Sequence, residues 1–229
     1  GEDGARTSDL ALGYGTQGES DIYYLTWGGG LKDGDFGLGA GVFDQSVGNL
    51  AGSGLDIDFS YLGIGYGRGM GDKDMAWGVS VVRINLELGY AGEELSGNEV
   101  TFDAGLTGTL PGSMPMRYGL VMRDVTDEIA RTWDIGVSVK PKETLTVGLD
   151  VKDLTDETDM RWQIGARQVL GKDGKWQVGA GLNDGDLSLG AIYAPGTEWQ
   201  GAKWRYGLAW QDTDGDSALI LGVTGAWGK

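Results

Sequence analysis

Nearly the whole chain alternates large apolar residues with small or polar ones, and in many stretches the intervening residue is glycine. The segments Phe36 to Val42 and Trp176 to Leu182 show the pattern clearly. A period of two is typical of a β-strand whose two faces meet different surroundings. Because segments of about ten residues with this pattern are separated by turn residues, the sequence predicts a transmembrane β-barrel.

Length and composition agree with one all-β unit. The 229 residues fit a single β-barrel domain over 1–229, since such domains often run to about 200–250 residues. The 44 glycines accompany only 4 prolines, 9 tryptophans and 9 tyrosines, which argues against a disordered or collagen-like chain. No run of about 18 apolar residues occurs, so we expect no transmembrane helix. The start, Gly1 to Asp3, indicates a mature or trimmed N-terminus.

The chain is strongly acidic, with a formal net charge of −16. Nucleic-acid binders neutralise phosphates with a basic surface, so we expect no nucleic-acid partner. Much of the acid falls in expected turns, for example at Asp33 and Asp35 and at Glu93 and Glu94. These residues fit charged loops at the mouth of a barrel, and they fit solvated turns that keep the protein soluble.

The sequence contains no histidine and no cysteine. Their absence removes Ser-His-Asp and Cys-His catalytic sites, the common zinc sites and haem ligation by these residues. Carboxylate-only chemistry stays open in principle. We therefore expect a protein that is not an enzyme, with no catalytic residues and no cofactor.

Fourteen strands are expected, and no segment has a useful helical period. Hairpin signals connect several of them, at Lys172–Gly174, Asn183–Gly185 and Asp214–Gly215. An even number places both chain ends on one side of a barrel. The expected strands are 8–16, 20–30, 34–45, 55–70, 74–90, 98–109, 115–124, 131–140, 143–153, 159–170, 174–183, 186–194, 202–211 and 217–228.

Alternation alone fits two architectures. In a barrel the apolar face meets lipid and the other face meets the lumen, whereas in a soluble sandwich the apolar face fills a core between two sheets. No strand looks like an edge strand blunted by Lys or Pro, which favours the barrel. The aromatics near strand ends suit a membrane interface, although they also fit ordinary core packing. They are Trp27, Trp77, Tyr90, Trp133, Trp162, Trp176, Tyr193, Trp204, Trp210 and Trp227.

A near-repeat occupies the second half of the chain. Arg123 to Glu128 and Lys152 to Glu157 share the unit basic-Asp-apolar-Thr-Asp-Glu, and a Trp-x-Ile-Gly segment follows each. The period of about thirty residues is close to one hairpin plus its loop, so the repeat indicates a duplicated β-hairpin.

Charged residues on the small-residue face are the best functional candidates. A lipid-facing Arg or Lys at the membrane midplane costs about 2–4 kcal/mol, so a barrel requires these charges to face the lumen. They fit either an Arg–Asp network bracing the interior or a selectivity lining. The lumen-lining candidates are Arg117, Arg123, Asp134, Asp150, Arg161, Arg167, Lys175, Lys203 and Arg205, with Asp103 on the same face.

Two further motifs give only weak evidence of a functional site. Gly13 to Gly18 matches G-x-G-x-x-G, but a second strand follows it where a phosphate site needs a helix. Asp212, Asp214 and Asp216 resemble the start of a Ca²⁺ loop, yet the spaced Glu is missing and the segment reads as a hairpin. We therefore expect no metal site, with these three aspartates as a weak calcium candidate.

Residues 115–229 resemble an outer-membrane barrel family. The segments that carry the resemblance are Leu145 to Leu154, Gly165 to Arg167 and Gln177 to Ala191, which look like a strand, a Gly-Leu-Asn-Asp-Gly hairpin and a strand. The family includes PorV-type proteins and the spirochaete-type barrels related to FadL transporters. The shared motifs are structural, and they imply an outer-membrane barrel that transports solutes or assembles with partners.

The sequence thus predicts a non-enzymatic barrel in a bacterial outer membrane, with the lipid bilayer as its partner, that passes small solutes as a porin or transporter does. The alternative is a structural subunit that self-assembles into a tube or layer at the cell surface, or that scaffolds a secretion or surface partner protein.

Overall fold

The computed structural model describes residues 7–17, 20–30, 36–47, 55–70, 74–112, 114–127, 129–155, 159–213 and 216–228. These residues form strands and turns, and none of them is helical. The strands are β1 Thr7–Gln17, β2 Ser20–Gly30, β3 Phe36–Val47, β4 Leu55–Gly69, β5 Met75–Tyr90, β6 Glu93–Leu110, β7 Met116–Arg123, β8 Thr132–Lys142, β9 Leu145–Lys152, β10 Arg161–Leu170, β11 Trp176–Asn183, β12 Asp186–Tyr193, β13 Glu198–Trp199, β14 Ala202–Thr213 and β15 Asp216–Gly228.

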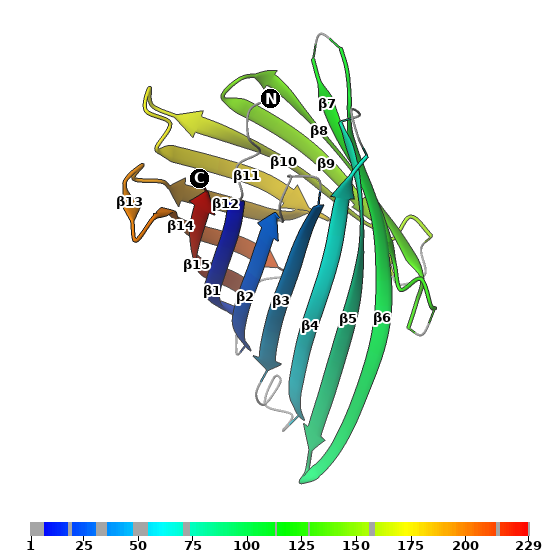
Figure 1. The fold of residues 1–229 in the computed structure, drawn as a ribbon. Coiled ribbons are helices and arrows are strands. Elements are labelled where there is room, and N and C mark those ends of the chain that lie inside the picture. Colours follow the sequence, from blue (N-terminus) through cyan, green and yellow to red (C-terminus); the bar gives the residue numbers. More distant parts are fainter. Residues whose placement is uncertain are drawn as a thin grey trace.

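The strands form one closed antiparallel barrel (Figure 1). Each strand except β12 pairs with the next strand in the sequence, and the whole length of β1 pairs with β15 to close the ring. The two-residue β13 lies beside the start of β14, and β12 pairs directly with β14. The ring therefore has the fourteen strands that the sequence predicts, with β13 as a short addition. No helix among the described residues is long and apolar enough to cross a membrane.

The expected strand boundaries are confirmed within a few residues, with one clear exception. Strand β6 begins at Glu93, five positions before the expected start. A tight turn at Ala91 and Gly92, with φ of 55° and 85°, continues β5 directly into β6. The sequence hides this start because residues 93–99 are almost all polar or small, so no apolar face marks the strand.

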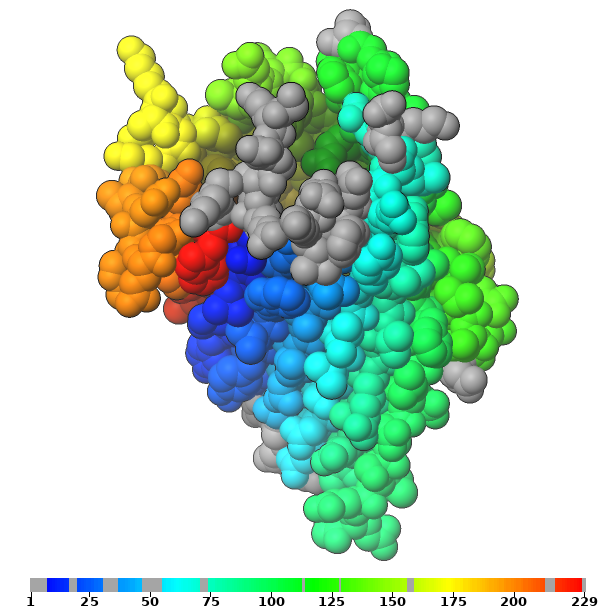
Figure 2. All heavy atoms as spheres, viewed as in Figure 1, coloured from blue at the N-terminus to red at the C-terminus, as the bar shows by residue number. Residues whose placement is uncertain are grey.

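Strand register settles which side chains share a face. Residues paired across neighbouring strands point to the same side, so the pairs Gly39–Gly65 and Gly179–Gly190 place these glycines together on the inner wall. Their neighbours in sequence, such as Ile64 and Leu189, point outward and are 60% and 46% exposed. Large apolar side chains therefore cover the outside, and small residues line the inside. Figure 2 shows the outer surface over β1 to β6.

Three strands are much longer than a membrane requires. Strands β4, β5 and β6 have 15, 16 and 18 residues, whereas about 9–11 residues cross a bilayer. Their extra length projects from one end of the barrel (Figure 1). We call this the distal end; it carries the Ala91–Gly92 turn and lies opposite the end that holds Thr7 and Gly228, the terminal end.

The apolar face changes sides where these strands leave the barrel. In β4, Leu62 and Ile64 point outward, but Phe59 and Tyr61 point inward, and the exposed Asp58 takes the outer side. The switch occurs in the same row of neighbouring strands, because Phe43 pairs with Tyr61 and Tyr61 pairs with Ile84. A row at which the outer face turns polar is expected where the wall passes from hydrocarbon into water.

One aromatic ring depends on glycine for its place. The ring of Tyr24 lies flat against the inner wall over Gly13 and Gly222, and a Cβ on Gly222 would come 2.6 Å from its hydroxyl oxygen. A side chain at either position would force the ring away from the wall. Packing of this kind fixes the register of neighbouring strands where glycine leaves a gap.

A charged residue introduced on the outer face tests the proposed lipid-facing belt, by which we mean the apolar rows of that face. Leu208 points outward between Tyr206 and Trp210, and it is 47% exposed. We expect Leu208→Arg to lower the free energy of unfolding in lipid vesicles by about 2–4 kcal/mol. Asp58→Arg, on the same face but beyond the polarity switch, is the control and should change it little. Equal effects of the two substitutions in a urea titration would contradict the belt.

Candidate functional site: the barrel lumen

The inner wall is unusually poor in side chains. Glycines occupy neighbouring inward positions on β3, β4, β5 and β6, where Gly39 pairs with Gly65 and Gly78 pairs with Gly105. They form the floor of a niche of about 700 Å³ that is bordered by Tyr61 and Arg123. Two more niches, of about 600 and 560 Å³, lie along β9 to β15 and along β6 to β10. Barrels of eight strands are filled by side chains, so fourteen strands with a glycine lining leave space inside.

Register places all the charged candidates except Lys175 on inward rows of the wall. Arg117, Arg123, Asp134 and Asp150 border one niche, and Arg167 and Asp150 border another. Arg161 pairs across the strands with Lys152, and Arg205 with Thr224. The remaining candidate on an inward row is Lys203, which pairs with Ala226.

Lys175 lies in the β10–β11 turn and not in the strand in which we expected it. Its ammonium lies 3.3 Å from Asp173, and its backbone N–H donates to the same carboxylate. These contacts, led by the backbone hydrogen bond, hold the pKa of Asp173 below its usual value. Lys175 thus stabilises the turn at the terminal end that connects the end of β10 at Leu170 to the start of β11 at Trp176.

Two inward aspartates brace the loops at the distal end. The Asp134 carboxylate accepts a hydrogen bond from Arg123 at 2.6 Å and another from the backbone N–H of Asp153. The Asp103 carboxylate accepts from the backbone N–H of Asp124. Asp134 is therefore held in a bracing network, the first of the two roles that its position allowed.

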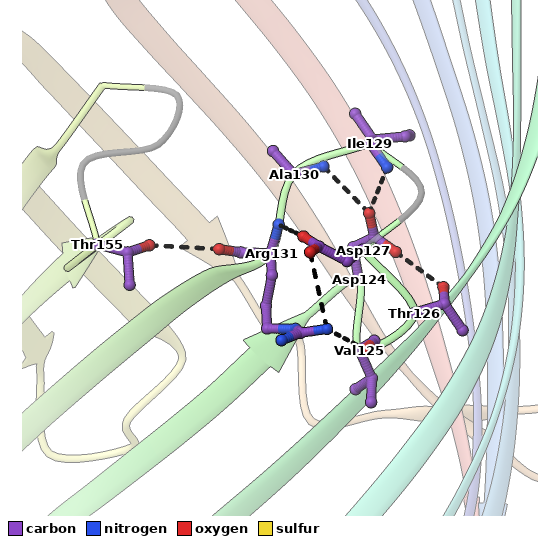
Figure 3. A network of polar contacts seen from close by, with 8 residues as sticks. All are labelled: Asp124, Val125, Thr126, Asp127, Ile129, Ala130, Arg131 and Thr155. Atoms are coloured by element: carbon purple, nitrogen blue, oxygen red, sulfur yellow. Dashed lines mark hydrogen bonds and ion pairs between the residues drawn. The ribbon is translucent and has the colours of Figure 1, made fainter.

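The sequence near-repeat forms two equivalent loops, of which one is shown in Figure 3. Asp124 is buried, has a positive φ, and accepts hydrogen bonds from the Thr126 hydroxyl and from the backbone N–H groups of Ile129 and Ala130. Asp153 is likewise buried with a positive φ and accepts from Thr155 and Asp159. The matching contacts fit a duplicated hairpin, and each aspartate holds its loop in a fixed shape.

The basic candidates other than Arg123 are more open. Among the described residues, Arg117, Arg161, Arg167, Lys203 and Arg205 have no ion pair, and all are exposed toward the lumen. They lie on β7, β10 and β14, so the charge is concentrated on one part of the wall. Arg167 borders a cavity of about 290 Å³ whose other walls are Tyr24, Ile192, Ile220 and glycines.

The opposite part of the wall carries an apolar inner face that the sequence analysis missed. It continues the glycine-lined region toward the distal end, and the rings of Phe43 and Phe59 meet edge-on at 6.2 Å. Its signal in the sequence is a pair of adjacent apolar residues at which the alternation changes phase, Tyr61–Leu62 and Val81–Val82. The apolar inner face consists of Ile22, Tyr24, Phe43, Ile57, Phe59, Tyr61, Val82, Ile84, Leu86 and Leu88.

The expected interface tryptophans all point outward near strand ends. Trp27, Trp77, Trp176, Trp204 and Trp227 lie at the terminal end, and Trp133, Trp162 and Trp210 lie toward the distal end. Those at the terminal end stack with neighbours, for example Trp176 with Tyr193 at 4.6 Å. Tyr90, grouped with them from the sequence, lies at the tip of β5 beyond the polarity switch and is 60% exposed.

The structure supports no functional role for the two weaker motifs, the glycine motif and the calcium candidate. The described part of the glycine motif, Gly13 to Gln17, lies in β1 and leads to β2 rather than to a helix. Asp212 and Asp216 lie on either side of the β14–β15 hairpin, and Asp214 lies outside the described residues. No group of three or more Asp, Glu, His or Cys side chains that could hold a metal ion occurs in the described part of the chain.

The fold has counterparts among solved structures. The CymD monoaromatic hydrocarbon channel is 11% identical with a TM-score of 0.61, and the match covers 100% of this chain and 89% of that one. The toluene transporter TbuX of Ralstonia pickettii is 13% identical with a TM-score of 0.62, covering 98% and 89%. The toluene transporter TodX of P. putida is 12% identical with a TM-score of 0.60, covering 100% and 91%.

At these identities the similarity shows the fold, which is that of outer-membrane transporter barrels. It supports the FadL-related part of the resemblance at the level of fold. No protein-family model matches the sequence, and no curated protein matches it.

If the lumen conducts ions, its unpaired basic residues should favour anions although the net charge is −16. Wall charge acts on ions nearby, whereas salt screens loop charge within about 8–10 Å. We expect Arg161→Glu with Arg205→Glu to shift the reversal potential in a salt gradient toward cation preference. Arg68→Glu is the control, because it makes the same change of charge as each of the two substitutions but at an outward-facing residue. An unchanged reversal potential would show that these residues do not line the conducting path.

Proposed function

We propose that the protein lies in a bacterial outer membrane and passes small, predominantly apolar solutes through its lumen. The observation that carries this proposal is the apolar inner face, which runs without interruption into a glycine-lined niche. Tyr61 belongs to both, because it lies in the apolar inner face and borders the niche of about 700 Å³. A solute could therefore move from one to the other along the β3–β4 side, while Asp103 and Arg123 border the niche on its β6–β7 side.

The apolar inner face is suited to capture apolar solutes from water. It stands where the outer surface of the same strands has already turned polar, at Asp58, Arg83 and Glu87. Covering apolar surface stabilises a complex by about 25 cal/mol per Å². A concave wall with Phe43, Phe59 and Ile84 on its inner side therefore offers a binding surface outside the bilayer.

The orientation follows from the projecting strands. Outer-membrane barrels carry their longer extensions on the outer side of the membrane and short turns on the inner side. We place the distal end outside the cell, so that the apolar inner face meets solutes before the lumen does. The neighbouring structures named as hydrocarbon channels and toluene transporters support an apolar solute.

Arg123 borders the niche and Arg167 borders a cavity beside Tyr24, but the other basic residues lie on a different part of the wall. The apolar inner face belongs to β2 to β5, whereas Arg117, Arg161, Arg167, Lys203 and Arg205 belong to β7, β10 and β14. A lumen of this kind offers an apolar side and a polar side. Water and ions can occupy the polar side while an apolar solute follows the other.

A structural role remains the second proposal, as a subunit that assembles with copies of itself or with a surface partner. Electron micrographs of purified protein separate the two. Ordered tubes or layers would favour assembly, and dispersed single barrels would favour solute passage. Neither role involves catalysis or a cofactor.

Added bulk in the lumen tests the route. The inward positions Gly65 and Gly190 have room for a side chain at the wall, since a Cβ added to them would lie 3.5 and 3.6 Å from its nearest neighbouring atoms. We expect Gly65→Trp with Gly190→Trp to reduce uptake of labelled toluene several-fold in cells that carry the barrel. Ile64→Trp with Ala191→Trp, at adjacent outward positions, should leave uptake nearly unchanged.

A second substitution tests the apolar inner face separately. Phe59→Asp should lower toluene uptake while leaving passage of a small sugar unaltered, because it removes apolar surface without narrowing the lumen. Equal toluene uptake by cells with and without the barrel would contradict solute passage, and equal loss of both solutes in Phe59→Asp would contradict an apolar route.

A further inference from the structure

Among the described residues, β6 has an open backbone edge at the distal end of the barrel wall. This strand pairs with β5 from Glu93 to Gly108, but it pairs with β7 only from Ala104 to Leu110. The β7–β8 loop makes one more backbone contact, from the Val125 N–H to the Phe102 carbonyl. From Glu93 to Thr101 no other strand among the described residues lies on this side, and Figure 1 shows β6 as the outer edge of the projecting strands.

The contact at Phe102 shows which residues present their backbone to the open edge. In an antiparallel sheet a residue points its N–H and C=O to the same side, and successive residues alternate. The Phe102 carbonyl points away from β5, so the N–H and C=O groups of Val100, Asn98 and Ser96 do as well. These residues are all exposed, which leaves a row of donors and acceptors ready to pair with another strand.

The open edge is acidic. Glu93, Glu94 and Glu99 lie on it, and Glu87 lies on the adjacent β5. Their side chains are exposed, and no ion pair to them occurs among the described residues. Two copies of this edge would bring at least six carboxylates together, which disfavours self-pairing because like charges on paired strands repel. A strand with basic residues would instead find opposite charges toward both ends of the edge, at Glu93 and Glu94 and at Glu99.

We propose that the β6 edge from Glu93 to Thr101 is a strand-addition site for an extended, basic segment of another protein at the distal end. The segment would add a strand beside β6, with hydrogen bonds to Ser96, Asn98 and Val100 and basic side chains against the glutamates. Backbone hydrogen bonds would supply much of the affinity, and the charges would select the partner. This site is independent of solute passage, because it lies on the outer margin of the wall and not in the lumen.

A capped peptide of alternating lysine and valine, nine residues long, is a suitable probe. It should bind the purified barrel in detergent, measured by fluorescence anisotropy, and binding should protect the amides of Ser96, Asn98 and Val100 from hydrogen exchange. The same peptide with every amide N-methylated keeps its charge but loses its strand hydrogen-bond donors on both edges, and it should bind at least tenfold more weakly. An alternating glutamate and valine peptide should not bind.

Two protein variants complete the test. Asn98→Pro removes an N–H that faces the open edge and leaves the β5 side intact, so it should weaken peptide binding about tenfold, whereas Asn98→Thr should not. Glu94→Gln with Glu99→Gln should weaken binding of the basic peptide and reduce its salt dependence. Unchanged toluene uptake in these variants separates the two proposals. Equal binding of the N-methylated peptide, or dimers of the barrel in sedimentation without peptide, would overturn strand addition at this edge.

Discussion

The structure depends on the requirement that every backbone N–H and C=O group within a hydrocarbon layer finds a partner in the protein. A sheet can meet this requirement only by closing on itself, because an open edge in lipid would leave a row of polar groups unpaired. Pairing of β1 with β15 provides the closure over eleven rows, from Thr7–Gly228 to Gln17–Ala218. Once the ring is closed, the period of two decides the rest: one set of side chains must meet lipid and the other must face the lumen.

The same requirement explains where the barrel can be irregular. Beyond the polarity switch at Tyr61 and Leu62, water can satisfy the backbone, so β6 can leave one edge free from Glu93 to Thr101. The apolar residues can also move to the inner side there, since the outer side no longer touches hydrocarbon. Within the membrane-spanning rows an open edge would leave backbone groups unpaired in hydrocarbon, and apolar residues are needed on the outer side. The apolar inner face and the open edge are therefore two results of one change of surroundings along the same strands.

Glycine and aspartate do different work in this architecture. Inward glycines keep the lumen free of side chains and let an aromatic ring, such as that of Tyr24, lie flat on the wall. Buried Asp124 and Asp153 stop strands and hold the following loops, because a carboxylate can accept several backbone N–H groups at once. The acidic composition is thus partly structural. Other acids lie along β6, and Asp150 lies on an inward row of β9 beside the basic residues of the lumen wall.

The sequence by itself determined the number of strands, nearly all of their boundaries and the outward position of the tryptophans, because alternation and turn residues are local signals. It could not determine which charged residues are paired. Asp134 and Arg123 lie on neighbouring strands, and only the register brings their side chains to 2.6 Å. Nor could it reveal the polar start of β6 or the open edge, since an edge is defined by the absence of a neighbour. Closure between strands at opposite ends of the chain and the apolar inner face were decided by tertiary structure, because pairing across the whole sequence sets what each face of a strand meets.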